Sequence, residues 1–365
     1  MSHVFVKFGH DGRQLTYDIL ESMQLGRQLD PAMTFGIKPN LVLAKPSESG
    51  ATTDPQVTAG IIEYLLDHGC SRITIMESSW LGDSTTRAFA KCGYEALSQR
   101  YGVPLVDLKR DSTYRCRVDD LDLDICRTPT DVDFLINVPV LKAHCQTHLT
   151  CALKNLKGCI PDTEKRRYHT LGLHRPIAAL NKALRQSLVV VDGIIGDLTF
   201  EEGGTPVTMD RVIAGQDPTA VDAYCASLLG LSLEQVPYIK MAADLGVGTS
   251  EYSITALNSG SEASLHTGSI GHLTKCVAED QACSACLGSL IHALRRLQDN
   301  DHPAPRQTLH IGQGYRGRGL PGVGVGSCTQ GASVHVPGCP PSAAQILEVL
   351  TNMLSDDDAK NSSSS

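Results

Sequence analysis

The sequence lacks the features of secreted, membrane-spanning and nucleic-acid-binding proteins. Its first residues, MSHVFVKFGHDGRQL, contain no apolar signal-peptide core, and no run approaches the ~18 to 20 apolar residues of a membrane-spanning helix. The 32 basic residues are outnumbered by 40 acidic ones, for a net charge of -8, whereas broad nucleic-acid binding needs a concentrated basic face. We therefore expect a cytoplasmic protein that binds neither membranes nor nucleic acids.

Cysteine, in contrast, is plentiful. Thirteen cysteines would suggest a disulfide framework in a short secreted chain, but this chain has 365 residues, an odd cysteine count and no secretory leader. Four of the thiols lie in a Gly-rich region near the end of the sequence: Cys283, Cys286, Cys328 and Cys339. A C-x-x-C pair with two further cysteines can enclose an iron–sulfur cluster or a structural zinc ion.

The spacing of these cysteines favours iron–sulfur over zinc. Cys286 and Cys328 are separated by 41 residues, whereas compact zinc sites bring their second ligand pair closer, at about 12 to 20 residues. Pro340 after Cys339 turns the chain beside the sulfur, as in ferredoxin-type sites. We predict one 4Fe-4S cluster on the four cysteines, with zinc at the same ligands or inert buried thiols as alternatives. Cys276 is a candidate fifth ligand.

Apolar β-rich runs alternate with helical patterns through the first two-thirds of the chain. We expect strands at residues 35–43, 72–77, 103–108, 133–138, 188–191 and 211–214, and helices at 56–68, 84–92, 175–186 and 217–229. This alternation predicts an α/β fold with a doubly wound, mainly parallel sheet. The first domain is expected to span residues 1–260.

A Ser, Gly and His-rich stretch at 258–272 marks a boundary, after which we expect a small C-terminal α/β iron–sulfur module at residues 266–354. The module would contain helices at 283–297 and 342–354, strands at 308–312 and 334–336, and a Gly-rich loop at 312–326. Residues 312–317 satisfy G-x-G-x-x-G, but no helix follows, so we expect this loop to wrap the cluster rather than a dinucleotide. Residues 355–365 read as a disordered tail.

Residues 137–175 carry the densest set of functional side chains. They follow a predicted parallel strand, and ligands of open α/β sheets bind beyond the carboxyl ends of such strands. Seven Lys and Arg residues face only Asp162 and Glu164 there, which predicts a small anionic substrate. His144 and His148 are four apart and could share a helical face. A solvated basic loop is the alternative. Weaker candidates follow other strands: Glu77, Asp192, Asp197 and Glu201.

Five phrases of the sequence resemble the DUF362 family, across most of residues 30 to 245. They are Lys38-Pro39-Asn40, NVPVLKAH at 137–144, TCALKNLKG at 150–158, DGIIGD at 192–197 and GQDPTAVD at 215–222. The resemblance implies a core that is often fused to iron–sulfur modules, in a family whose chemistry is largely unassigned. This chain has cysteines for one cluster at most, unlike an ordinary two-cluster ferredoxin fusion.

A more distant similarity is to the nickel-pincer lactate racemases. That family has a His, a cofactor-bearing Lys ten residues later and another His; His144, Lys154 and His169 stand in comparable order here. The family's Gly-rich approach to the lysine is missing, because Cys151-Ala152-Leu153 precedes Lys154, and this disfavours a nickel cofactor.

Together these observations predict an iron–sulfur oxidoreductase, or a related cluster-dependent enzyme, that acts on a small anionic substrate. The expected catalytic residues are Lys154, His169 and His144. The expected substrate-binding residues are Lys142, His148, Asn155, Lys157, Arg167 and Arg175. A racemase-like metal enzyme and a pure electron-transfer protein are the alternatives, and an electron-transfer partner and a homodimer are further expectations.

Overall fold

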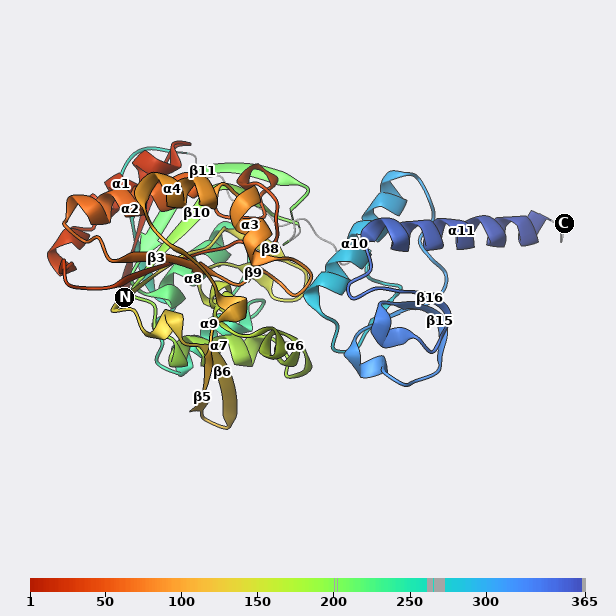
Figure 1. Cartoon of the computed structure of the whole chain (residues 1–365). Coiled ribbons are helices and arrows are strands. Elements are labelled where there is room, and N and C mark those ends of the chain that lie inside the picture. Colours follow the sequence, from red (N-terminus) through yellow and green to blue (C-terminus); the bar gives the residue numbers. More distant parts are fainter. Residues whose placement is uncertain (200, 202, 261–264, 266–272, 363–365) are drawn as a thin grey trace. The chain divides into compact units, whose positions relative to one another are not determined.

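The computed structural model describes all residues except 200, 202, 261–264, 266–272 and 363–365, and it describes no side chains from 355 onward. The chain forms two compact units, Met1–Thr267 and Gly268–Ser365 (Figure 1). Part of the predicted boundary at 258–272 lies outside the described residues. No helix in the described part of the chain has the length and apolarity needed to cross a membrane.

Unit 1 is built on an eight-stranded sheet in the order β12-β1-β11-β10-β7-β2-β3-β4. The strands are β12 (Tyr252–Ala256), β1 (Ser2–Phe8), β11 (Pro206–Gly215), β10 (Leu188–Asp197), β7 (Phe134–Val138), β2 (Phe35–Pro39), β3 (Ile73–Glu77) and β4 (Leu105–Asp107). Only β11 runs antiparallel to its neighbours. The connection at 198–205 is too short for the crossover that a parallel neighbour needs, so β10 and β11 form an antiparallel pair. The predicted mainly parallel α/β fold is confirmed.

Helices cover both faces of this sheet. One face carries α1 (Gly12–Ser22), α2 (Pro55–Asp67), α3 (Thr85–Lys91) and α4 (Tyr94–Tyr101), and the other carries α5 (Ala152–Asn155), α7 (His174–Ala183), α8 (Pro218–Leu228) and α9 (Pro237–Asp244). Strand side chains alternate between the two cores: Val189 and Val191 face one, and Val190 faces the other. Each fully buried side chain of this kind stabilises the fold by about 1.5–3 kcal/mol.

Local sequence signals explain where some of these helices begin. Asp217 caps α8 by accepting hydrogen bonds from the backbone N–H groups of Thr219 (2.9 Å) and Ala220 (3.1 Å), and Pro218 occupies the first helical position. Asp54 and Pro55 begin α2 in the same way. Within residues 137–175, where a solvated basic loop was the alternative, Asp162–Thr170 forms helix α6.

Two hairpins lie outside the main sheet: β5 (Thr113–Val118) with β6 (Leu121–Cys126), and β8 (Lys142–His144) with β9 (His148–Thr150). The predicted helical face for His144 and His148 is therefore wrong, because the two residues pair across a hairpin. The imidazole of His144 closes the turn, since its Nδ1 accepts hydrogen bonds from the backbone N–H groups of Gln146 and Thr147, each at 3.0 Å.

Unit 2 has a four-stranded sheet in the order β13-β14-β15-β16, in which every neighbouring pair is parallel. Its elements are β13 (Val277–Glu279), α10 (Ser284–Asp299), β14 (Leu309–Ile311), β15 (Leu320–Val325), β16 (Ala332–Val336) and α11 (Ala343–Ser362). Strand β15 lies inside the predicted Gly-rich loop at 312–326, because Val323 and Val325 are buried in the core despite the flanking glycines. Helix α11 continues into the segment predicted as a disordered tail.

Candidate functional site

The candidate site of unit 1 lies at the carboxyl ends of its central parallel strands. From β2 the chain proceeds to β3 and β4 on one side of the sheet, whereas β7 lies on the other side of β2 and is followed by β10. The boundary between β2 and β7 is thus the point where the strand order reverses, and ligands of doubly wound folds bind at such a point. Lys38, Asn40, Glu77 and Asn137 all lie at these strand ends.

A buried polar network joins the strand ends to helix α5. The Nζ atom of Lys38 lies 2.9 Å from Oε1 of Glu77 and donates to Oδ1 of Asn155 at 3.3 Å. Asn155 also accepts a hydrogen bond from Asn40 (2.8 Å) and donates one to Asn137 (2.7 Å). Asn155, predicted to bind substrate, therefore anchors α5 across β2 and β7.

Asp222, in α8, holds the other end of α5. Its carboxyl group accepts hydrogen bonds from the backbone N–H groups of Ala152 (2.7 Å) and Leu153 (3.1 Å), which begin the helix. Burial raises the pKa of Asp222 to about 7, and the two N–H groups oppose this shift. The result is a short helix fixed at both ends, from which Lys154 projects.

Lys154 meets a carboxylate from the β10–β11 connection. Its ammonium group forms an ion pair with Oε1 of Glu201 and donates a hydrogen bond to the hydroxyl oxygen of Thr150 at 3.2 Å. Oε2 of Glu201 lies 3.0 Å from Nε2 of His144. The side chains of Lys154 and His144 are 5% and 0% exposed, and that of Glu201 is 13% exposed. We call Lys154, His144, Thr150 and Glu201 the Lys154 site.

The contacts of His144 determine its protonation. Because Nδ1 accepts two backbone hydrogen bonds, a neutral imidazole carries its proton on Nε2, the atom that faces Glu201. Burial lowers the pKa of His144 to about 4, with a further contribution from the charge of Lys154, while Glu201 opposes the shift. His144 is therefore a neutral proton donor at physiological pH.

Glu201 is the charged counterpart. Burial alone would raise its pKa, but Lys154 and His144, with Lys142, lower it well below the ordinary value. Lys142 adds a structural link, because its ammonium group donates to the backbone oxygens of Ala51 (2.6 Å) and Glu201 (3.0 Å). The site thus holds an ionised carboxylate between two cationic side chains and a neutral imidazole.

His169 and Lys157 belong to the same electrostatic neighbourhood. The pKa of His169 lies well below its ordinary value, first because of burial and then because of the nearby basic side chains, led by Lys157. Its buried Nδ1 has no hydrogen-bond partner among the described residues. His169 lies in α6, and its Nδ1 atom is therefore a candidate proton acceptor.

Three predicted substrate-binding residues lie elsewhere. His148 is exposed at the tip of its hairpin, with a φ of 61°. Arg167 forms a two-pronged ion pair with Glu164, at 2.7 and 2.8 Å, and Arg175 pairs with Asp120 while remaining 52% exposed. The charge count over residues 137–175 did not include Asp120, which lies outside that segment and pairs with Arg175. Nor did it show that Glu164 lies one helical turn before Arg167 and pairs with it.

The four weaker candidates from the sequence divide into residues of the buried site networks and residues that support the backbone. Glu201 and Glu77 join the buried networks, whereas Asp197 accepts hydrogen bonds from the backbone N–H groups of Thr199 and Thr205 and so shapes the turn after β10. Asp192 accepts from the N–H groups of Asp54 and Ile194, and burial raises its pKa to about 7. Lys38 and Asn40 lie in the middle of the strand predicted at 35–43, and only the observed end of β2 at Pro39 reveals them as strand-end residues.

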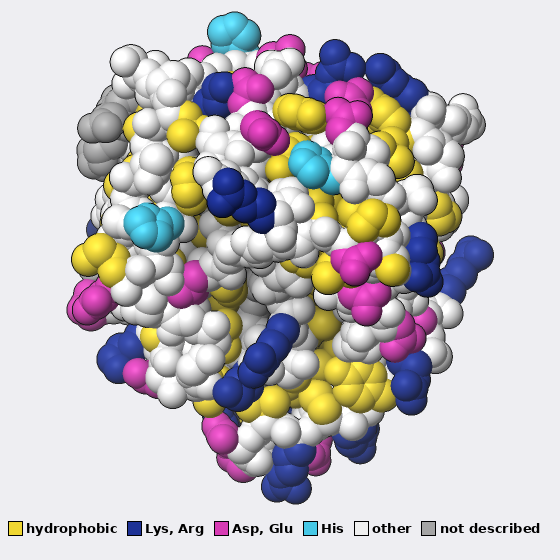
Figure 2. All heavy atoms as spheres, turned by 90° about the vertical axis from the view of Figure 1, so that its left-hand side faces the viewer, with side chains coloured by type: hydrophobic (Ala, Val, Ile, Leu, Met, Phe, Trp, Pro, Cys, Tyr) yellow, Lys and Arg dark blue, Asp and Glu magenta, His cyan; other side chains and the backbone are white. Residues whose placement is uncertain are grey.

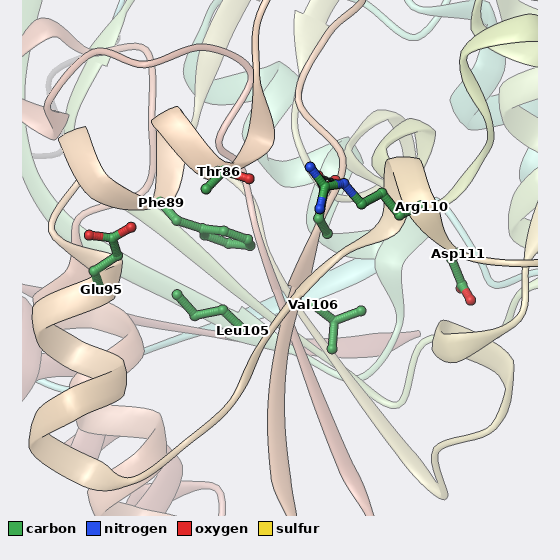
Figure 3. A pocket seen from close by; sticks show the side chains of 8 residues that line it. Thr86, Phe89, Glu95, Leu105, Val106, Arg110 and Asp111 are labelled. Atoms are coloured by element: carbon green, nitrogen blue, oxygen red, sulfur yellow. Dashed lines mark ion pairs between the residues drawn. The ribbon is translucent and has the colours of Figure 1, made fainter.

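On one face of the molecule (Figure 2), the cationic side chains do not gather into an alternative anion site. On the face shown in Figure 2, basic and acidic side chains are interspersed, without an extended field of one sign. A surface cavity of about 520 Å³ lies beside β4 (Figure 3) and is lined by Thr86, Phe89, Glu95, Leu105, Val106, Asp107, Arg110 and Asp111. None of these residues belongs to the Lys154 site, and its charges are of both signs.

In unit 2, the predicted cysteine ligands lie in loops that follow the parallel strands. Cys283 and Cys286 follow β13, Cys328 follows β15 and Cys339 follows β16. Burial raises the pKa of Cys286, and the negative charges of Cys283, Cys339 and Cys328 raise it further, so the four sulfurs form one electrostatic group. We call these four residues the cysteine group.

Backbone contacts hold the loops of the cysteine group together. Ser327 donates hydrogen bonds from its N–H (2.8 Å) and its hydroxyl group (3.0 Å) to the backbone oxygen of Gly338. Gly326 has a φ of 89°, and a Cβ atom there would lie 3.7 Å from the sulfur of Cys286. The positive φ favours glycine at this position, and the backbone here lies beside this sulfur.

Four thiol groups are a donor set that can bind iron or zinc. Cys283 caps α10 and Cys286 lies in its first turn, where the helix dipole favours thiolates. Within the described part of the chain, no three His, Cys, Asp or Glu side chains are close enough to share a single metal ion.

Comparison with known proteins finds a curated relative and, among the solved structures that match, two distant neighbours. The chain is 25% identical over 248 residues to the "Thylakoid-associated protein sll1697" of Synechocystis sp., covering 63% of this chain and 74% of that protein. A lactate racemase apoprotein from Thermoanaerobacterium thermosaccharolyticum aligns with a TM-score of 0.42 and 12% identity, and a Thermotoga maritima protein with 0.40 and 13%. These alignments cover 62% and 61% of this chain, but only 57% and 60% of the two neighbours.

The family comparison is more extensive. The family described as "Domain of unknown function (DUF362)" matches residues 36–227, which include the end of β2, the β8–β9 hairpin, α5 and Glu201. The match covers more than half of the 365 residues and confirms the resemblance seen in the sequence. This protein belongs to the DUF362 family.

Proposed function

We propose that this protein is an iron–sulfur oxidoreductase that acts on a small anionic substrate. In this proposal the cysteine group of unit 2 holds one 4Fe-4S cluster, and the Lys154 site of unit 1 binds the substrate. The observation that supports the proposal is the position of the four cysteines after the parallel strands β13, β15 and β16, and hence at the same edge of one sheet. A bound cluster would supply one-electron transfer.

The roles of the side chains in unit 1 follow from their charges. Lys154 would bind the anion, because its ammonium group is buried and a charge interaction is stronger there than in water. His144 would donate a proton from Nε2, and Glu201 or the neutral His169 would accept one. The pairing of Lys154 with the carboxylate of Glu201 supports this role, and a bound anion would replace or join that carboxylate.

A nickel cofactor on Lys154 has less support. Covalent attachment requires a free amine, whereas the ammonium group of Lys154 is paired with Glu201 and hydrogen-bonded to Thr150. A pure electron carrier would not need the buried anion site, and the experiment below separates it from an enzyme.

The experiment begins with anaerobic purification, followed by iron, sulfide, zinc and nickel analysis and visible spectroscopy. We expect about four irons and four sulfides per chain, lost in Cys286→Ser and Cys339→Ser but retained in Cys276→Ser, because Cys276 lies before β13 and outside the cysteine group. Stoichiometric zinc without sulfide would contradict the cluster.

The second arm is titration calorimetry with small carboxylates and inorganic phosphate. Binding should be lost in Lys154→Ala and retained in Arg175→Ala, the matched control, because Arg175 is half-exposed and paired with Asp120. An intact cluster with no anion binding at all would identify an electron carrier instead of an enzyme.

A further inference from the structure

The loop after β14 contributes no cysteine to the cysteine group, but it contributes two nitrogen donors. Nε2 of Gln313 lies 3.7 Å from the sulfur of Cys283, and Nε of Arg316 donates to the sulfur of Cys328 at 3.3 Å. All four strands of the unit 2 sheet are therefore followed by a loop that touches a sulfur of this group.

Backbone hydrogen bonds fix the β14 loop against the loop that carries Cys283. The N–H of Gln313 donates to the backbone oxygen of Gln281 (3.2 Å), and the N–H of Gly314 donates to that of Asp280 (3.0 Å). Gly312 has a φ of 129°, and a Cβ atom there would lie 1.9 Å from the oxygen of Asp280. Only glycine at position 312 lets the loop lie this close to the backbone of Asp280. Arg316 follows the short helical turn Gln313–Tyr315 of the same loop.

The charge of Arg316 acts on more than one sulfur. The pKa of its guanidinium is raised first by the hydrogen bond and charge of Cys328, and then by Cys283 and Cys339. Arg318, two residues later, differs because it lies 3.7 Å from Asp280 and over the ring of Tyr315. Arg316 directs its charge at the sulfurs, whereas Arg318 is paired with a carboxylate.

We propose that Arg316 raises the reduction potential of the centre held by the cysteine group, by placing a positive charge and an N–H···S hydrogen bond on Cys328. This inference rests on the proposed cluster. Reduction adds one electron, and hence one negative charge, to the cluster and its thiolates, while no bond breaks and no proton moves. A fixed cation stabilises the reduced form more than the oxidised form, so it makes reduction easier.

Arg316 is a tuning residue in this proposal, because it acts through Cys328 rather than on a substrate. Its guanidinium is exposed, so salt should weaken its effect. The planar guanidinium keeps its charge at every accessible pH and directs its Nε–H group at the sulfur of Cys328.

The test is an anaerobic redox titration with dithionite as the reductant, followed by EPR and visible spectroscopy, on the full-length protein. Three variants are compared with the wild type: Arg316→Gln, Arg316→Lys and, as the matched control, Arg318→Gln. We expect Arg316→Gln to retain iron and sulfide and to shift the midpoint to a more negative potential. Arg316→Lys should recover part of that shift, Arg318→Gln should match the wild type, and added salt should narrow the difference.

An Arg316→Gln midpoint equal to that of the wild type would overturn the inference, and so would an equal shift in Arg318→Gln. Loss of iron and sulfide from both Arg316 variants would also overturn it, by showing that Arg316 supports the fold of the site. A wild-type protein without iron and sulfide would refute the proposed function itself, which separates the two failures.

Discussion

At the scale of single residues, the Lys154 site fixes the protonation states of a histidine and a carboxylate by lowering the pKa of each. His144 stays neutral because burial and Lys154 disfavour its charge, and Glu201 stays ionised because Lys154 and His144 favour its charge. Such paired shifts separate a proton donor from a proton acceptor at one pH.

The shift at His144 predicts a pH dependence of stability. An unfolded histidine binds a proton below pH ~6.5, whereas folded His144 does so only near its pKa of about 4. The unfolded state therefore binds more protons between these values, and the free energy of unfolding falls as the pH falls. From about pH 7 to about pH 5, this residue should cost roughly 2 kcal/mol.

Denaturant unfolding of His144→Asn against pH checks this expectation. The variant should lose that part of the pH dependence, while His148→Asn, the exposed partner across the hairpin, should follow the wild type. Curves for His144→Asn and the wild type that run parallel across this range would contradict the assigned protonation.

The sequence identified part of this site because its residues are close together in the chain. Lys142, His144 and Lys154 follow one predicted strand, and their types indicated anion binding and proton transfer. Glu201 comes from another strand's connection, and only the sheet order brings it to Lys154. Arg167 and Arg175 were predicted to bind an anion because arginine is positively charged. In the structure, however, Arg167 pairs with Glu164 and Arg175 with Asp120.

At the scale of elements, a four-residue helix carries Lys154, and such a helix cannot be stable by itself. Its position depends on Asp222 at one end and Asn155 at the other. Helices with local start signals, such as Asp217-Pro218 in α8, were predictable from sequence, whereas α5 was not, because its cap comes from a residue far along the chain.

Removing the cap of α5 should destabilise unit 1. Asp222→Ala leaves the N–H groups of Ala152 and Leu153 buried without a partner, which should cost on the order of 2 kcal/mol in the free energy of unfolding. Asp222→Asn, which keeps one acceptor oxygen, should lose less, and urea unfolding near pH 6 compares the two. Equal stability of Asp222→Ala and the wild type would mean that α5 does not depend on this cap.

At the scale of the whole molecule, each unit has its own apolar core. In unit 1 helices pack on both faces of the sheet, and in unit 2 the buried side chains of α10, such as Leu290 and Ile291, accompany buried residues of β14 and β15. The repeated strand–helix pattern made the α/β fold of unit 1 predictable from the sequence. Strand β15 was not predicted because its glycines are typical of a loop, and its burial depends on neighbouring strands.

Separate cores predict separate unfolding transitions in scanning calorimetry. Asp222→Ala should lower the midpoint temperature of one transition, and Cys286→Ser should lower that of the other, each leaving the second midpoint unchanged. A single transition that both substitutions shift equally would show that the two units unfold together.

The all-parallel sheet of unit 2 also has a consequence for biosynthesis. Because its strands run in one direction, thiols as distant in the sequence as Cys283 and Cys339 meet only after the final strand has joined the sheet. A nascent chain still short of Cys339 lacks one sulfur. An inorganic centre bound by all four thiols can therefore be completed only after translation has passed that residue.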